Sequence, residues 1–130
     1  MRGGGVARSA ADNHFSKAVR TRDHFTCQFC GKEGNEAAHI YGRAKKSVRW
    51  SMDNAVTLCN YHHRYFTAHP IDFYDWLRSY LGDGHLEILR EKANSLLKTN
   101  KALRDEISKH YREELKKVER NPLHRIVSYN

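Results

Sequence analysis

The chain has 130 residues, of which 39% are hydrophobic, and its mean hydropathy is −0.82. Its core is therefore modest, and a small core gains stability from a staple such as a bound metal ion. The formal net charge of +8 at pH 7 favours a polyanionic partner such as nucleic acid, because binding releases counterions condensed on the phosphates. The sequence has no run of about eighteen apolar residues and no apolar signal core, which argues against a membrane span and a secretory signal.

The N-terminal part is predicted to contain a lead and one helix. Residues 1–12, with three consecutive glycines, are expected to form a flexible lead. A helix is predicted over residues 13–22, with Asp12 or Asn13 as its N-terminal cap. Its apolar face carries Phe15, Ala18 and Val19.

Two pairs of metal-binding residues follow at the same two-residue spacing. Cys27 and Cys30 form the first pair, and Cys59 and His62 form the second. Such pairs let tight turns present four ligands to one tetrahedral Zn²⁺ ion, and glycines at 31 and 34 permit the first turn. All three cysteines have ligand spacing, which argues against a disulfide framework and for a reducing cytoplasm. We expect a structural zinc ion in a cytoplasmic protein.

A strand, a loop and a second strand are predicted between these pairs. Residues 36–41 alternate as in a short strand, which places His39 on one face and Glu36 on the other. Residues 56–58 are expected to return as its partner. The loop at 41–50 has no acid and four basic residues that we expect to contact DNA phosphates; these are Arg43, Lys45, Lys46 and Arg49. Exposed solvated arginines are the alternative reading for the first and last of them, and Trp50 is expected in the core.

Two helices are predicted next, over residues 60–67 and 71–81, separated by Pro70. His62 and His63 are neighbours on the first helix, so their side chains diverge by about 100°. One can face the zinc ion while the other faces the cleft between hairpin and helix, and the two could exchange these roles. His69 is interpreted as a polar helix-end residue rather than a metal ligand.

The last third has the pattern of an amphipathic helical extension. Apolar residues recur at three-to-four spacing from Leu86 to Val118, with a joint near residues 99–100. Such a face packs on the core or pairs with a second copy of the chain, which would give a homodimer. The alternative is direct contact of these charged helices with DNA. The predicted fold class is α+β, and the domain plan reads 1–12 flexible lead, 13–82 zinc-stapled core, 83–120 helical extension and 121–130 tail.

Four short motifs follow one another in an order that resembles the zinc-stapled HNH (His-Asn-His) nucleases: Cys-x2-Cys, Ala38-His39-Ile40, Asp53-Asn54 and Leu-Cys-x2-His-His. The resemblance covers about a third of the chain and implies a ββα-metal core. Arg43 and the word Ser-Val-Arg-Trp at 47–50 are also similar to phage recombination nucleases of the NinG (Rap-like) type.

The resemblance implies roles for three residues. His39 falls on the first His of the family and would be the general base, since an ordinary imidazole pKa of about 6.5 lets it accept a proton near neutral pH. His63, on the last His, would bind a divalent cation such as Mg²⁺, Mn²⁺ or Ni²⁺. Asn54 would either coordinate that cation or hold the hairpin so that His39 points correctly.

One position departs from the commonest family pattern. Many members carry an Asp directly before the first His as a metal ligand, where this chain has Ala38. Asn54, water and substrate phosphate would then complete the metal shell. Glu36 is left out of it, because a regular strand places it on the face opposite His39. Weak cleavage, or cleavage of a special substrate, is therefore expected.

Two functions are compatible with these features. The first is a metal-dependent DNA endonuclease, structure-specific in phage-type recombination if the narrower resemblance holds. The second is a zinc-dependent DNA-binding module without catalysis, which would need the same cysteines and basic loop. A binding module has no need of His39, Asn54 and His63 in family register, which favours the nuclease.

Overall fold

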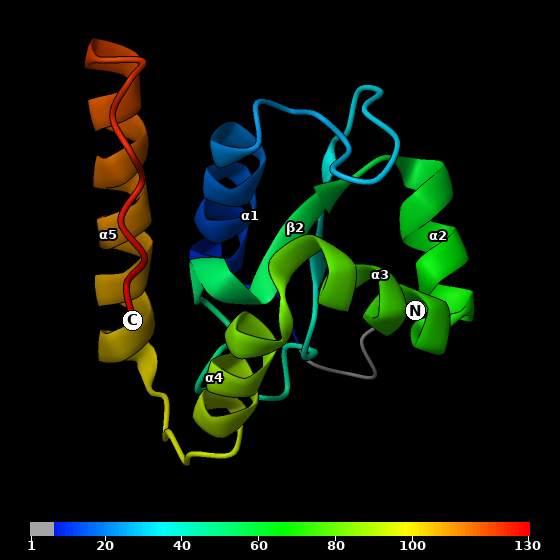
Figure 1. The fold of residues 1–130 in the computed structure, drawn as a ribbon. Helices are drawn as coiled ribbons and strands as arrows, with labels where there is room; N and C mark the ends of the chain where they lie inside the picture. The colour runs from blue at the N-terminus through cyan, green and yellow to red at the C-terminus, as the bar shows by residue number, and fades with distance from the viewer. Residues whose placement is uncertain (1–6) are drawn as a thin grey trace.

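A computed structural model describes residues 7–130 (Figure 1). Within these residues five α-helices and a short 3₁₀ helix surround a two-stranded antiparallel sheet, so the predicted α+β class is confirmed. In chain order the elements are α1 (Ala10–Arg22), β1 (Glu36–His39), η1 (Met52–Asn54), β2 (Ala55–Leu58), α2 (Asn60–Ala68), α3 (Pro70–Leu81), α4 (Asp83–Ala93) and α5 (Lys101–Arg120).

Helix α1 begins at Ala10, three residues before its predicted start. Ser9 is the N-cap, and its hydroxyl accepts a hydrogen bond from the Asp12 main-chain N–H at 3.4 Å. The Asp12 carboxylate in turn accepts from the Ser9 N–H at 2.7 Å, which completes a capping box. The prediction of Asp12 or Asn13 as the cap was therefore wrong, because Asp12 acts from the third helical position. Residues 1–6 of the predicted lead lie outside the described part of the chain.

The hairpin of β1 and β2 lies between α1 on one side and α2 on the other (Figure 1). Its register pairs Glu36 with Leu58 and His39 with Ala55. Alternate residues of β1 face two separate cores: Ala37 packs with the α1 cluster, and Ala38 packs with the cluster under α2 and α3. The functional side chains of β1 are thus divided between the two faces of the sheet.

Helix α5 packs along α1, and residues 121–130 run back beside α5 as an extended segment (Figure 1). The buried residues Ile107 and Tyr111 of α5 share a core with Phe15 and Trp50, as expected for Trp50. The apolar stripe of the helical extension is therefore covered within the chain, and dimerisation through it stays a prediction. Leu96, which the periodicity included, is 98% exposed in the α4–α5 connection.

Residues 121–130 are tied to the domain by main-chain and side-chain hydrogen bonds. The Val127 N–H donates to the Glu114 carboxylate at 2.9 Å, and the Ser128 hydroxyl accepts from the Met52 N–H at 3.0 Å. The Asn130 amide donates to the Ser47 carbonyl at 2.8 Å. These contacts connect the predicted tail to α5, to η1 and to the loop that precedes η1.

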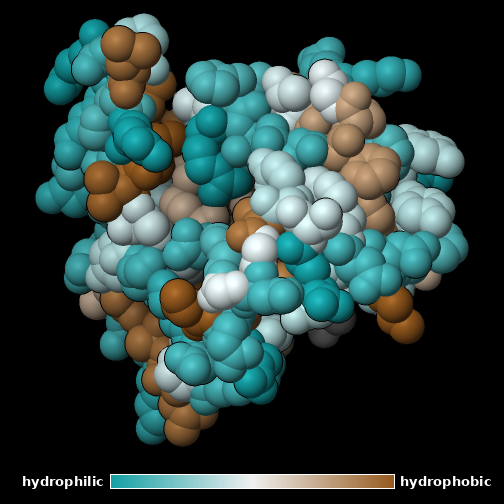
Figure 2. All heavy atoms as spheres, viewed as in Figure 1, coloured by the Kyte–Doolittle hydropathy of each residue, from teal (hydrophilic) through white to brown (hydrophobic). Residues whose placement is uncertain are grey.

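Hydrophilic residues cover most of the face seen in Figure 2, and hydrophobic residues gather chiefly along α5 and the segment beside it. Among residues 7–130, no helix combines the length and the apolar character needed to cross a lipid bilayer.

Candidate functional site

Four side chains gather where the turn before β1 meets the start of α2. The ligand atoms of Cys27, Cys30, Cys59 and His62 all lie within 4.8 Å of one another. The two sulfurs of Cys30 and Cys59 are 4.0 Å apart, and the Cys59 sulfur is 3.3 Å from Nδ1 of His62. A tetrahedral zinc ion holds such atoms roughly 3.3–3.8 Å apart, given bonds of about 2.0–2.3 Å. The cluster therefore fits a zinc ion, and it contains His62 rather than His63.

The turn that contains Cys27 and Cys30 needs glycine at two positions and lowers the pKa of the Cys27 thiol. Gly31 has φ +79°, and a Cβ on Gly34 would lie 2.7 Å from the Cys27 nitrogen, so both positions need glycine. Burial raises the pKa of the Cys27 thiol, but hydrogen bonds from main-chain N–H groups, including that of Cys30, lower it overall. A thiol that ionises easily is suited to a metal ligand.

His39 ends β1 and is anchored through one ring nitrogen. Its Nε2 lies 3.1 Å from the main-chain carbonyl of Arg49, an acceptor, so Nε2 carries the proton and Nδ1 keeps the lone pair. The ring also lies against Phe15 of α1, with ring centroids 5.5 Å apart. Burial lowers the pKa of His39 to about 4, and the hydrogen bond to Arg49 only partly opposes this. The ordinary pKa expected for this imidazole was therefore wrong, and at pH 7 it is neutral.

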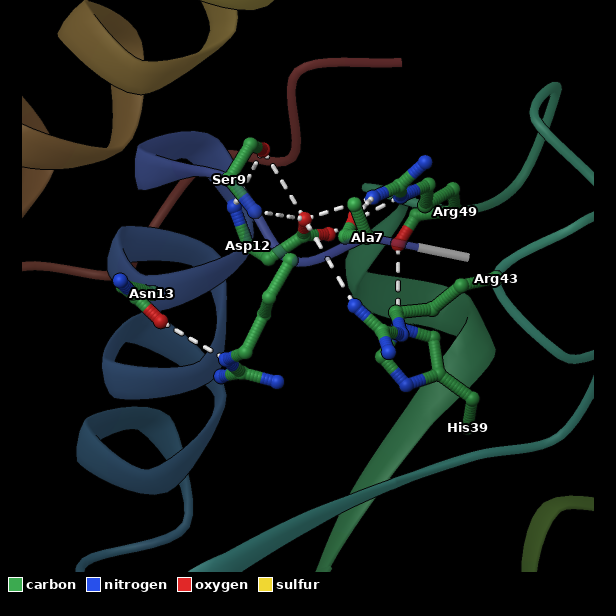
Figure 3. Close-up of polar contacts among 8 residues, drawn as sticks. Ala7, Ser9, Asp12, Asn13, His39, Arg43 and Arg49 are labelled. Atoms are coloured by element: carbon green, nitrogen blue, oxygen red, sulfur yellow. Dashed lines mark hydrogen bonds and ion pairs between the residues drawn. The ribbon is translucent and has the colours of Figure 1, made fainter. Parts of the chain in front are cut away.

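A buried ion pair lies near His39 (Figure 3). Arg49 donates from Nε and Nη2 to the two carboxylate oxygens of Asp12, at 3.0 and 2.6 Å. Burial raises the pKa of Asp12, but hydrogen bonds from Arg49 and Ser9 lower it overall. Arg49 is only 5% exposed, so its guanidinium is committed to Asp12 and the phosphate contact predicted for it is not supported.

The remaining basic residues of the loop differ in exposure. Lys45 and Lys46 are exposed. Arg43 is mostly buried, with a side-chain nitrogen 3.8 Å from the Asp12 carboxylate. The charge that this loop presents to solvent therefore comes chiefly from the two lysines.

Asn54 is fully buried, and its side chain hydrogen-bonds the main chain of Tyr41. Its side-chain oxygen accepts from the Tyr41 N–H at 2.8 Å, and its nitrogen donates to the Tyr41 carbonyl at 2.9 Å. The Tyr41 backbone is thereby removed from strand pairing, so β1 ends at His39 rather than at residue 41. Of the two roles considered for Asn54, this geometry matches the holding of the hairpin. The prediction that it coordinates a cation is not supported.

His63 projects from α2 toward the start of β1. Its Nδ1 lies 2.6 Å from Oε1 of Glu36, and the second oxygen of Glu36 accepts from the Asn60 amide at 3.0 Å. Partial burial raises the pKa of Glu36, but the hydrogen bonds from Asn60 and His63 lower it overall. Glu36 was correctly separated from His39, yet its contact with His63 was missed. Strand alternation could have indicated this contact, because it places Glu36 on the face of β1 that is covered by the helix carrying His63.

His39 and His63 line the same cavity. It has a volume of about 220 Å³, and apolar side chains such as Phe66 and Phe73 form much of its wall. A second hollow of about 420 Å³ opens beside it and is lined by Glu36, His63 and Arg64. His63 thus stands between the two. His69 hydrogen-bonds the Tyr65 carbonyl at 2.8 Å at the end of α2, in agreement with its reading as a helix-end residue.

A model of the HNH endonuclease family matches residues 27–73, the segment from the first cysteine through α2 into α3. The resemblance to HNH nucleases is therefore confirmed for this segment, while the narrower resemblance to phage recombination nucleases stays a prediction. No curated protein and no solved structure matches the chain.

Proposed function

Since residues 27–73 match the HNH endonuclease family, we propose that this protein is a metal-dependent DNA endonuclease. The observation that carries the proposal is the cavity shared by His39 and His63, with the His39 ring already oriented by the Arg49 carbonyl. The net charge of +8 supports a nucleic-acid substrate.

Hydrolysis of a phosphodiester requires a base for the attacking water and positive charge at the leaving oxygen. His39 is suited to the first task, because its neutral imidazole presents the Nδ1 lone pair while Nε2 stays bonded to Arg49. Its low pKa makes it a weak base, so we expect cleavage to be modest.

His63 would hold the divalent cation, Mg²⁺ or an ion such as Mn²⁺ or Ni²⁺. The donor set fits a cation that keeps water and phosphate oxygens in its shell: one imidazole, about one-third exposed, beside an ionised carboxylate. When bound, such an ion supplies charge for the leaving oxygen. Asn54 keeps the Tyr41 turn closed behind His39, and Lys45 and Lys46 would contact phosphates.

Plasmid nicking tests the proposal. Zinc-loaded protein is incubated with supercoiled DNA and Mg²⁺, Mn²⁺ or Ni²⁺, with and without chelator, in parallel with His39→Ala. We expect cation-dependent nicking that falls about 10²- to 10⁴-fold in the variant, while DNA affinity is retained. Binding of equal strength without nicking by the parent protein would favour the DNA-binding module instead.

A panel of labelled duplex, single-stranded, flap and four-way DNA addresses the narrower proposal of a recombination nuclease. Preferential cleavage of a branched substrate supports it. Equal cleavage of plain duplex contradicts it and leaves the nuclease proposal intact.

A further inference from the structure

Glu36 and His63 join the first strand of the hairpin to the helix that follows it. One carboxylate oxygen of Glu36 contacts Nδ1 of His63 at 2.6 Å, and the other accepts from Asn60 at 3.0 Å. Both oxygens are therefore held by α2. The side chains are 34% exposed for His63 and 36% for Glu36, so the pair lies at the surface of the hollow it lines.

This contact decides which nitrogen of His63 can accept. An ionised carboxylate accepts hydrogen bonds and donates none, so the proton between the two groups belongs to Nδ1. In the neutral ring the lone pair then remains on Nε2. The Thr67 hydroxyl donates to the main-chain carbonyl of His63 at 2.7 Å, a contact that does not constrain the ring.

We propose that Glu36 is a positioning residue for the cation site: it fixes His63 as the Nδ1–H tautomer and thereby reserves Nε2 for the divalent cation. This inference rests on the proposed function, in which His63 holds that cation. Metal-binding histidines commonly donate their second N–H to a carboxylate, and loss of such a partner costs about 10- to 100-fold in metal affinity.

The position before His39 makes this role more important. Ala38 offers no carboxylate to a cation, and the amide of Asn54 is occupied by Tyr41. Within the described residues of the cavity wall, His63 is then left as the main nitrogen donor for the cation beside the base His39. Its tautomer and orientation consequently control the affinity of the site.

The first measurement needs no activity. Long-range ¹H–¹⁵N correlation spectra of the zinc-loaded, ¹⁵N-labelled protein, recorded near pH 8, report which nitrogen of His63 carries the proton. We expect Nδ1–H in the parent and in Glu33→Gln, a control that neutralises an exposed glutamate bonded to Asn35. Glu36→Ala should lose this preference. Glu36→Gln should retain part of it, because its amide oxygen can still accept.

The second measurement is Mn²⁺ affinity by titration calorimetry on the same proteins. We expect a loss of about 10- to 100-fold in Glu36→Ala, a smaller loss in Glu36→Gln, and no change in Glu33→Gln. Melting temperature and zinc content identify any variant that has failed to fold, and Glu36→Gln keeps the shape of the native side chain.

Three outcomes would overturn the inference. They are an Nε2–H tautomer in the parent, unchanged Mn²⁺ affinity in Glu36→Ala, or loss of the Nδ1 proton when Mg²⁺ binds, which would make Glu36 and Nδ1 direct ligands. Each can occur in a protein that nicks DNA. Conversely, Glu36-dependent Mn²⁺ binding by a protein that nicks no substrate would support the positioning role and reject the nuclease.

Discussion

Asp12 and Arg49 form a two-point ion pair that is almost completely buried, although 37 positions separate them along the chain. Asp12 also belongs to the capping box of α1, and the carbonyl of Arg49 accepts from His39. The first turn of α1 thereby supports the loop that orients the proposed base (Figure 3).

Asp12→Ala should destabilise the protein by about 3–5 kcal/mol, because it leaves the charge of Arg49 buried without a partner. Thermal or urea unfolding measures this effect. Asn13→Ala is the control, since within residues 7–130 its side chain accepts a hydrogen bond from Arg8 at an exposed site, and it should change stability by less than about 0.5 kcal/mol. Equal stability of the two variants would mean that the ion pair is not maintained in solution.

Nicking should stay nearly constant from about pH 8 to 5 and fall only near pH 4, because burial lowers the pKa of His39 to about 4. This replaces the decline near pH 6.5 that an ordinary imidazole would give. The measurement is the initial nicking rate against pH at saturating Mn²⁺. A midpoint near 6.5 would show that His39 is solvated or is not the base.

The same pKa affects stability. The unfolded chain takes up a proton on His39 below about pH 6.5, whereas the folded chain does so only near pH 4. Stability contributed by the neutral ring is therefore lost as the pH falls from 6.5 to 4. His39→Gln should reduce that slope in urea unfolding, and an unchanged slope would contradict the burial of the ring.

His62→Ala should lose zinc and stability, whereas His63→Ala should keep both and lose cation-dependent nicking. The reason is that only His62 lies in the cysteine cluster, and the binding energy of a structural zinc ion is folding energy. Elemental analysis and melting temperature give the comparison, with one zinc ion per chain expected in the parent. The reverse pattern would assign zinc to His63.

Lys45→Ala combined with Lys46→Ala should weaken DNA binding and reduce the log–log salt slope by about 0.9 for each lost contact on duplex DNA. Both side chains are exposed in the loop after His39. Lys109→Ala with Lys116→Ala removes the same charge from α5 and is the control. If the control has the larger effect, DNA binds α5 rather than the loop.

Glu114→Gln should release residues 121–130 and lower stability by about 1.5–3 kcal/mol, because hydrogen bonds to an ionised acceptor are lost. Burial raises the pKa of Glu114, but the Val127 N–H, His124 and Lys117 lower it to about 2. The unfolded carboxyl protonates below about pH 4.5, so this stability disappears as the pH falls from 4.5 to 2. Amide hydrogen exchange at Val127 measures the release of this segment, and Glu113→Gln, at an exposed position, is the control. Equal protection of Val127 in both variants would mean that Glu114 does not hold residues 121–130.

The sequence by itself determined the features that depend on short spacing. The two ligand pairs, the divergence of His62 and His63 on one helix, and the hairpin between the pairs all follow from local geometry, because a turn or helix places neighbours by its own dimensions. The match of one family to residues 27–73 agrees with that local pattern.

Tertiary structure alone decided which polar side chains are available for chemistry. In the sequence Arg49 is indistinguishable from an exposed loop arginine, and only the packing of α1 shows its ion pair with Asp12. Asn54 has the residue type of a metal ligand, but in the fold its amide is hydrogen-bonded to the main chain of Tyr41. Glu36 acquires its role only when α2 folds over β1 and brings His63 within 2.6 Å. The same holds for the pKa of His39, because burial and charge at one residue depend on distant segments that composition and periodicity do not specify.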